Sequence, residues 1–156
     1  MQDRIEKEIL IEASPAAVWA VVTQPAHIER WFSDSAAFDL QPGAEGSLTW
    51  RDKATKSPTT VRLTIEKVDE LRYFAFRWDY LENEQAAEGN SLLVEFSLSP
   101  EGLNTRLRLV ESGFAALRRP DADKQRYFED HNQGWTVHLG RLSEYAVAER
   151  GRSPVR

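Results

Sequence analysis

The chain has 156 residues, the length of one ordinary domain, and 41% of them are hydrophobic. It contains no cysteine, which excludes disulfides, thiolate catalysis and cysteine-based zinc sites and fits a cytoplasmic location. The net charge of −5 and the shortness of the basic clusters argue against nucleic acid as a partner. No apolar run approaches the roughly 20 residues that insertion across a membrane requires.

The first part of the chain is predicted to form a strand and two short helices. Residues 4–13 alternate between isoleucine and glutamate, the pattern of a strand with one wet face. Ser14 and Pro15 are typical of a helix N-cap followed by the first helical position. Pro25 is expected to begin a second short helix.

An alternation of apolar and polar residues, with a period of two, then predicts six further strands. They are expected at residues 36–40, 46–52, 59–68, 71–80, 91–99 and 104–112. Each run has one apolar side, and its neighbour follows through a short turn. The sequence therefore predicts a curved antiparallel meander.

One long helix is expected at the C-terminal end. Asp121 or Asp123 is expected to cap its start and Gly151 to end it, which gives at most about 30 residues, or roughly 45 Å. Its apolar positions recur with a period of 3.6 and are Phe128, Trp135, Leu139, Leu142 and Ala146. The interpretation is a single domain over residues 1–150, followed by a flexible tail over residues 151–156.

The predicted fold class is α+β, with about seven antiparallel strands curved around the long C-terminal helix. The sheet has one apolar face and a single long helix to cover it. A curved sheet around a helix leaves space between the two layers, and such a space favours a ligand pocket.

Two stretches resemble a known family. "IEASPAAVWAVVTQPAHIERWFSD" is similar to the opening of START-like (SRPBCC) proteins with the helix-grip fold, and within them to the family of the activator of the heat-shock-protein-90 ATPase (AHSA-like). "TRLRLVESGF" and "HNQGWTVHLGRLSEYA" resemble that family's last strand and its G-W-x-x-x-L-x-x-L helix. The resemblance covers residues 4 to 148.

This resemblance implies the helix-grip fold and leaves several functions open. Members of the superfamily bind lipids, polyketides, steroids or flavonoid-like molecules, and some are cyclases or dehydratases of aromatic polyketides. Members that act as co-chaperones usually carry a second domain, for which a chain of this length has no room.

The two histidines of the C-terminal helix do not form a convincing metal site. His131 and His138 are seven residues apart, which places them two turns or roughly 10 Å apart on a helix. No third ligand has a suitable spacing, so no metal or other cofactor is expected. His138 is interpreted as a packed or pocket-lining residue, His131 as partly exposed, and His27 as a surface residue.

Glu111 is the most informative polar residue. If Leu107 and Leu109 face inward, the strand period takes Glu111 inward as well, where a carboxylate needs a partner. The alternative is that the strand ends earlier and leaves Glu111 in water. Arg77 and Asp79 fall on the presumed outer face and are expected to form a solvated pair.

The residues expected to bind a ligand come from the inner face of the sheet and from the covering helix: Trp50, Phe76, Trp78, Phe96, Leu109, Glu111, Trp135, His138 and Leu142. Trp19 and Trp31, on the short helices, are expected to be structural. Gly134 removes a side chain beside Trp135, which predicts a close approach of the helix to the sheet or to the short helices.

The leading hypothesis is the binding of a small hydrophobic molecule, such as a lipid, a polyketide or a flavonoid-like aromatic. One rival is a cyclase or hydrolase that acts on a hydrophobic substrate with Glu111 and His138. The other is a co-chaperone-like protein that binds a protein partner through its outer surface. Catalysis requires two polar groups that converge in the pocket, whereas partner binding requires an exposed apolar patch.

Overall fold

The computed structural model describes residues 2–150. Its elements are β1 (Arg4–Ile11), α1 (Pro15–Thr23), α2 (Pro25–Trp31), β2 (Ser35–Ala37), β3 (Glu45–Arg51), β4 (Pro58–Asp69), β5 (Tyr73–Trp78), β6 (Leu92–Glu101), β7 (Asn104–Ser112) and α3 (Asp121–Glu149). This order of elements agrees with the sequence prediction. Within the described residues, no helix is long and apolar enough to cross a membrane.

The strands form one seven-stranded sheet in the order β1-β7-β6-β5-β4-β3-β2. Every pair of neighbouring named strands is antiparallel, as predicted. The pairs between β2 and β7 join consecutive strands, as in a meander. The exception is β1, which pairs with β7 from Arg4 opposite Ser112 to Ile11 opposite Thr105. The first and last strands therefore lie side by side.

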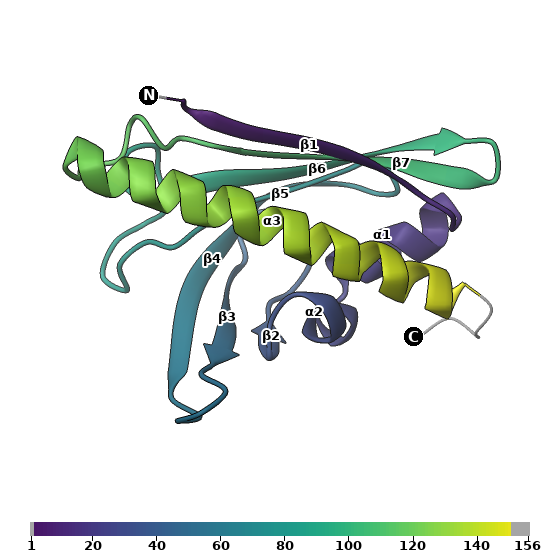
Figure 1. Cartoon of the computed structure of the whole chain (residues 1–156), viewed down its shortest axis with the longest axis horizontal. Coiled ribbons are helices and arrows are strands. Elements are labelled where there is room, and N and C mark those ends of the chain that lie inside the picture. Colours follow the sequence, from purple (N-terminus) through teal and green to yellow (C-terminus); the bar gives the residue numbers. More distant parts are fainter. Residues whose placement is uncertain (1, 151–156) are drawn as a thin grey trace.

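The long helix α3 crosses one face of the sheet, and α1 and α2 lie beside its C-terminal half (Figure 1). The hairpin of β3 and β4 extends away from the rest of the sheet below the helix (Figure 1). This arrangement is the predicted helix-grip fold.

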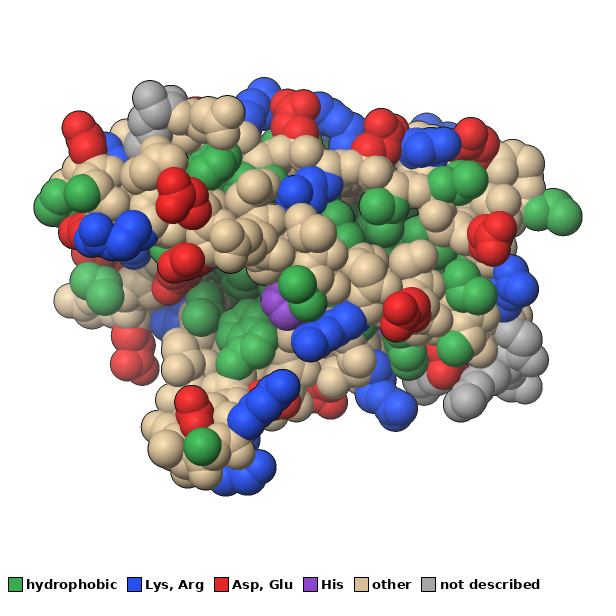
Figure 2. All heavy atoms as spheres, in the orientation of Figure 1, with side chains coloured by type: hydrophobic (Ala, Val, Ile, Leu, Met, Phe, Trp, Pro, Cys, Tyr) green, Lys and Arg blue, Asp and Glu red, His purple; other side chains and the backbone are tan. Residues whose placement is uncertain are grey.

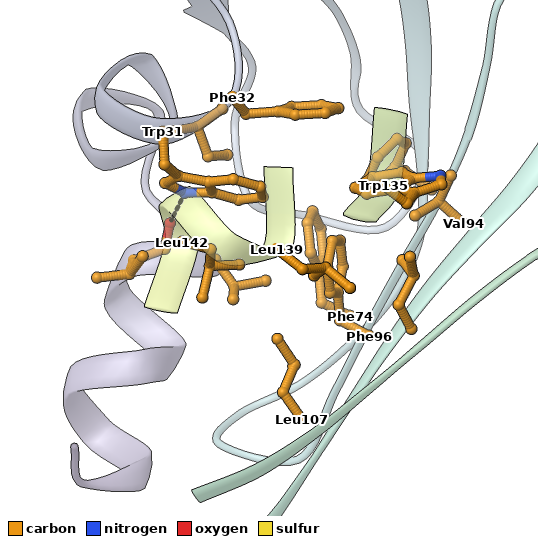
Figure 3. Close-up of a cluster of buried hydrophobic side chains, with 14 of the residues drawn as sticks. Trp31, Phe32, Phe74, Val94, Phe96, Leu107, Trp135, Leu139 and Leu142 are labelled. Atoms are coloured by element: carbon orange, nitrogen blue, oxygen red, sulfur yellow. Dashed lines mark hydrogen bonds between the residues drawn. The ribbon is translucent and has the colours of Figure 1, made fainter. Parts of the chain in front are cut away.

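The core lies between α3 and the sheet. Figure 3 shows Trp135, Leu139 and Leu142 of α3 facing Phe74 and Phe96 of the sheet. The predicted helical stripe is confirmed in full, because its five members are the buried residues of α3. Trp31 of α2 and Phe32, which directly follows this helix, close the same cluster, and the Trp31 indole donates a hydrogen bond to the Val21 carbonyl (Figure 3). Trp19 and Trp31 are both buried, as expected of structural tryptophans.

The predicted caps have different outcomes at the two helices. Ser14 caps α1, since its hydroxyl accepts a hydrogen bond from the Ala17 N–H at 3.2 Å. Neither Asp121 nor Asp123 caps α3, because the helix begins one residue after Pro120 and both aspartates lie in its first turn. In that turn their negative charges still interact favourably with the positive end of the helix dipole. Gly151 and the predicted tail lie outside the described residues.

Candidate functional site

A cavity of about 230 Å³ lies between α3, the sheet and the β3–β4 hairpin. In Figure 2 it is a hollow below α3, with hydrophobic side chains on its floor and a histidine at its edge. Its apolar walls are Phe32, Trp50, Val61, Trp78 and Trp135. Its polar members are Asp79, Asp130, His131 and His138, and the backbone of Gly134 completes the lining. The predicted space between sheet and helix is therefore present.

The residues expected to bind a ligand divide into three groups. Trp50, Trp78, Trp135 and His138 line the cavity. Phe76, Phe96, Leu109 and Leu142 are buried and belong to the packed core; the two phenylalanines border only a void of about 10 Å³. Glu111 lies behind the cavity wall. The four core residues do not line this cavity, because α3 packs directly on that part of the sheet.

Glu111 is fully buried and accepts three hydrogen bonds. Its Oε2 accepts from the Trp78 indole at 2.7 Å, and its Oε1 accepts from the Trp135 indole at 2.9 Å. Oε1 also lies 2.7 Å from Nδ1 of His131. Because indole N–H groups only donate, Glu111 acts as the acceptor that a carboxylate provides. This one buried carboxylate thus fixes two walls of the cavity and one histidine.

The strand period correctly places Glu111 inside, while its partners come from long-range packing. β7 extends to Ser112, so the strand does not end early, and Glu111 lies opposite Val94 of β6. The predicted partial exposure of His131 is confirmed, since its side chain is 18% exposed. The pairing of His131 with Glu111 was missed. The sequence feature that could have predicted this pair is the helical stripe that His131 shares with Trp135, combined with the inward direction of the Glu111 carboxylate.

The predicted pair of Arg77 and Asp79 does not form. Arg77 pairs with Glu66 on the outer face at 3.3 Å. Asp79 follows the end of β5 with a positive φ of 67°, so the strand alternation no longer applies there. Its carboxylate lines the cavity and accepts a hydrogen bond from the Tyr127 hydroxyl. Burial and the Asp79 charge raise the pKa of Tyr127, so this hydroxyl keeps its proton.

His138 faces Phe32, with ring centroids 4.8 Å apart in an edge-to-face contact. Burial lowers the pKa of its imidazole, Arg141 lowers it further, and a hydrogen bond to the Trp31 backbone raises it. Its Nδ1 is buried without a hydrogen-bond partner among the described residues. His138 is therefore a neutral, largely packed ring at neutral pH. Within residues 2–150, no group of three or more histidine or acidic side chains could hold a metal ion.

His27 is buried, and the prediction of a surface position is wrong. Its side chain is covered by α3, and its Nδ1 lies 2.6 Å from the Tyr145 hydroxyl. Burial lowers the pKa of His27, with an opposing contribution from Glu149. The helical pattern of α2 alone could not show this, because the covering residue is 118 positions later in the chain.

The close approach predicted at Gly134 is absent. A Cβ added there would meet only Cδ2 of His138, at 4.0 Å. The missing side chain instead leaves part of the cavity open, because Gly134 belongs to its lining.

Gly134→Ala is therefore expected to raise the free energy of unfolding by about 1 kcal/mol, the usual gain when a helical glycine becomes alanine. Gly140→Ala is the matched control, because nothing lies within 4 Å of a Cβ at that position of α3 and Gly140 is outside the cavity lining. Urea denaturation of both variants tests this. A destabilised Gly134→Ala beside a stabilised Gly140→Ala would restore the close-approach interpretation.

The stability of the fold is expected to decrease as the pH falls below about 6.5. The pKa values of His27 and His138 are lowered in the folded protein from the usual 6.5. In this range the unfolded chain binds protons more readily, so protonation favours unfolding. The stability that the two neutral histidines contribute is fully present above pH 6.5. It is lost as the pH falls through their pKa values in the folded protein. Urea denaturation between pH 8 and 5 measures it, and His138→Gln should reduce the slope. An unchanged slope in that variant would contradict the assignment to His138.

Comparisons with solved structures agree on the fold. Protein NE0264 from Nitrosomonas europaea has 16% identity and a TM-score of 0.79, with 96% of this chain and 97% of that chain covered. Protein MLL2253 from Mesorhizobium loti has 23% identity and a TM-score of 0.73, covering 93% and 97% of the two chains. The Aha1 dimer from Colwellia psychrerythraea has 16% identity and a TM-score of 0.70, covering 92% and 95%. No curated protein sequence matches the chain significantly.

The sequence profile of one family matches most of the chain. It is described as "Activator of Hsp90 ATPase homolog 1-like protein" and aligns with residues 12–146, from the end of β1 to the last turns of α3. The matched region includes both stretches that carried the resemblance in the sequence. The chain therefore belongs to the family of activator of Hsp90 ATPase homolog 1-like proteins, a START-like family.

Proposed function

We propose that the protein binds a small hydrophobic molecule in the cavity between α3 and the sheet. The observation that carries this proposal is a wall of three indole rings and one phenyl ring around about 230 Å³ of space. Trp50 and Trp78 lie 6.2 Å apart between ring centroids, and Trp78 and Trp135 lie 6.1 Å apart. Mostly apolar linings with a few polar groups are typical of small-molecule sites.

The size of the cavity favours a compact ligand. Sites for drug-sized molecules usually measure about 300–1,000 Å³, and this cavity of about 230 Å³ is smaller. One or two fused aromatic rings fit such a volume better than a sterol or a long acyl chain. Rings also match the flat indole surfaces, against which offset or edge-to-face contacts are favourable.

The test uses naphthalene as a probe. Its binding is measured by NMR chemical shifts and by tryptophan fluorescence. Binding should perturb the indole signals of Trp50, Trp78 and Trp135. Val61→Phe should weaken binding, because residue 61 lines the cavity and the larger ring fills it. Val137→Phe is the control, since this α3 side chain is 53% exposed and outside the cavity lining. Absence of binding by naphthalene and by a panel of fatty acids, sterols and flavonoids would refute the proposal.

Binding of a protein partner is the second candidate, and the family match favours it. The large exposed hydrophobic side chains of the described residues, however, come from separate segments: Leu10, Leu71, Leu81, Leu103 and Val137. Partner binding of the kind that the family description implies predicts a faster ATPase rate of Hsp90 when the protein is added. An unchanged rate under conditions where naphthalene binds favours the ligand-binding function.

A further inference from the structure

The polar members of the cavity lining are almost all hydrogen-bond acceptors. Asp79 and Asp130 offer carboxylate oxygens. The indole N–H groups that could act as donors already have acceptors: Trp78 and Trp135 donate to Glu111, and Trp50 donates to the Phe32 carbonyl at 2.8 Å. A ligand that satisfies this lining must therefore bring its own donor.

His131 supplies the best-placed acceptor. Because the Glu111 carboxylate can only accept, Nδ1 of His131 carries the hydrogen of their 2.7 Å contact. In the neutral imidazole, the other nitrogen, Nε2, then has a free lone pair. This nitrogen has no hydrogen-bond partner among residues 2–150, and it is not one of the buried unpartnered atoms. The ring itself lines the cavity.

The surroundings of His131 hold the ring in one orientation. Tyr127 lies 4.2 Å away between ring centroids, and Trp78 and Phe114 contact the imidazole edge-to-face at 5.7 and 5.8 Å. The Glu111 carboxylate fixes the tautomer, as a buried acidic group commonly does for a functional histidine. The lone pair of Nε2 is thus pre-positioned at the polar end of a cavity whose other walls are aromatic.

We propose that the ligand is an aromatic molecule of one or two rings with a hydroxyl group, and that Nε2 of His131 accepts the hydrogen bond of this hydroxyl. Glu111 is a positioning residue, since it acts through His131 and does not line the cavity. This inference rests on the proposed function, because it assumes that the cavity is the binding site. It adds the chemical class of the ligand and the atom that recognises it.

The experiment compares 2-naphthol with 2-methoxynaphthalene, which lacks the donor, and with 2-methylnaphthalene, which has the size of naphthol without its polarity. Isothermal titration of the native protein should show 2-naphthol binding about tenfold more tightly than either analogue, the effect of one net hydrogen bond. In ¹⁵N NMR spectra, 2-naphthol should shift the Nε2 signal of His131 much more than the Nδ1 signal.

His131→Phe should retain the aromatic packing and bind all three probes with similar affinity. Gln133→Ala is the control on the neighbouring turn of α3, where residue 133 is exposed and outside the lining, and it should keep the preference. Equal binding of the three probes to the native protein would overturn the role of His131 while leaving the proposed function intact. Absence of binding by all three would also overturn the role of His131, and it would overturn the proposed function if naphthalene and the panel of fatty acids, sterols and flavonoids failed to bind as well. Because the native protein alone decides between these results, the test does not depend on the folding of a variant.

Discussion

Glu111→Ala is expected to lower the free energy of unfolding by about 3–5 kcal/mol, because each buried donor that is left without an acceptor costs about 1–3 kcal/mol. The substitution leaves the indole N–H groups of Trp78 and Trp135 without an acceptor and deprives His131 of its partner. It also leaves an empty space at a fully buried position. Urea denaturation measures the loss.

The control for this prediction is Glu6→Ala on β1. Glu6 forms ion pairs with Arg4 and Arg108, but all three side chains are about half exposed. Exposed ion pairs contribute at most about 1 kcal/mol, so this variant should remain close to the native stability. If Glu111→Ala cost no more than Glu6→Ala, the carboxylate would not hold the cavity wall together.

Trp135→Ala is expected to lower the free energy of unfolding by roughly 3–5 kcal/mol, the range for a buried large aromatic side chain. The ring is 2% exposed, stacks on Phe32 at 5.2 Å between centroids and contacts Phe96 edge-to-face at 6.0 Å. It is also part of the cavity lining, so the affinity for naphthalene should decrease as well. Core packing and pocket lining, which the sequence presents as alternatives, belong here to one side chain.

Thermal and urea denaturation together with NMR titration test both effects on the same variant. Val137→Ala provides the comparison, because this residue lies two positions further along α3 and is 53% exposed. Its stability should stay within about 0.5 kcal/mol of the native value. A Trp135→Ala protein with native stability and native affinity would show that α3 presents a different face to the sheet.

Local periodicity accounts for what the sequence predicted well. Alternation over residues 104–112 identified β7 and carried Glu111 to the inner face, because side-chain direction in a strand follows from position alone. The 3.6-residue stripe of α3 identified its buried residues for the same reason. These features depend on neighbours within a few residues, and so a single sequence is sufficient to predict them.

The features that the sequence did not predict depend on how distant segments pack. His27 is buried because Tyr145 of α3 covers it, and the two residues belong to opposite ends of the chain. Asp79 enters the cavity because the backbone leaves the strand conformation at that residue, which a period of two does not anticipate. The partner of Glu111 is His131 rather than His138. Which of the two histidines reaches Glu111 depends on how α3 is rotated and positioned over the sheet.

The pairing of β1 with β7 also has a consequence during protein synthesis. Arg4 pairs with Ser112, so the first strand leaves the ribosome about 100 residues before its partner, a delay of roughly 5–20 s at about 5–20 residues per second. During this interval the apolar side of β1 and its unpaired backbone are open to chaperones and to other nascent chains. α3 is synthesised after all seven strands, so the Glu111 contacts and the cavity form only after α3 has left the ribosome.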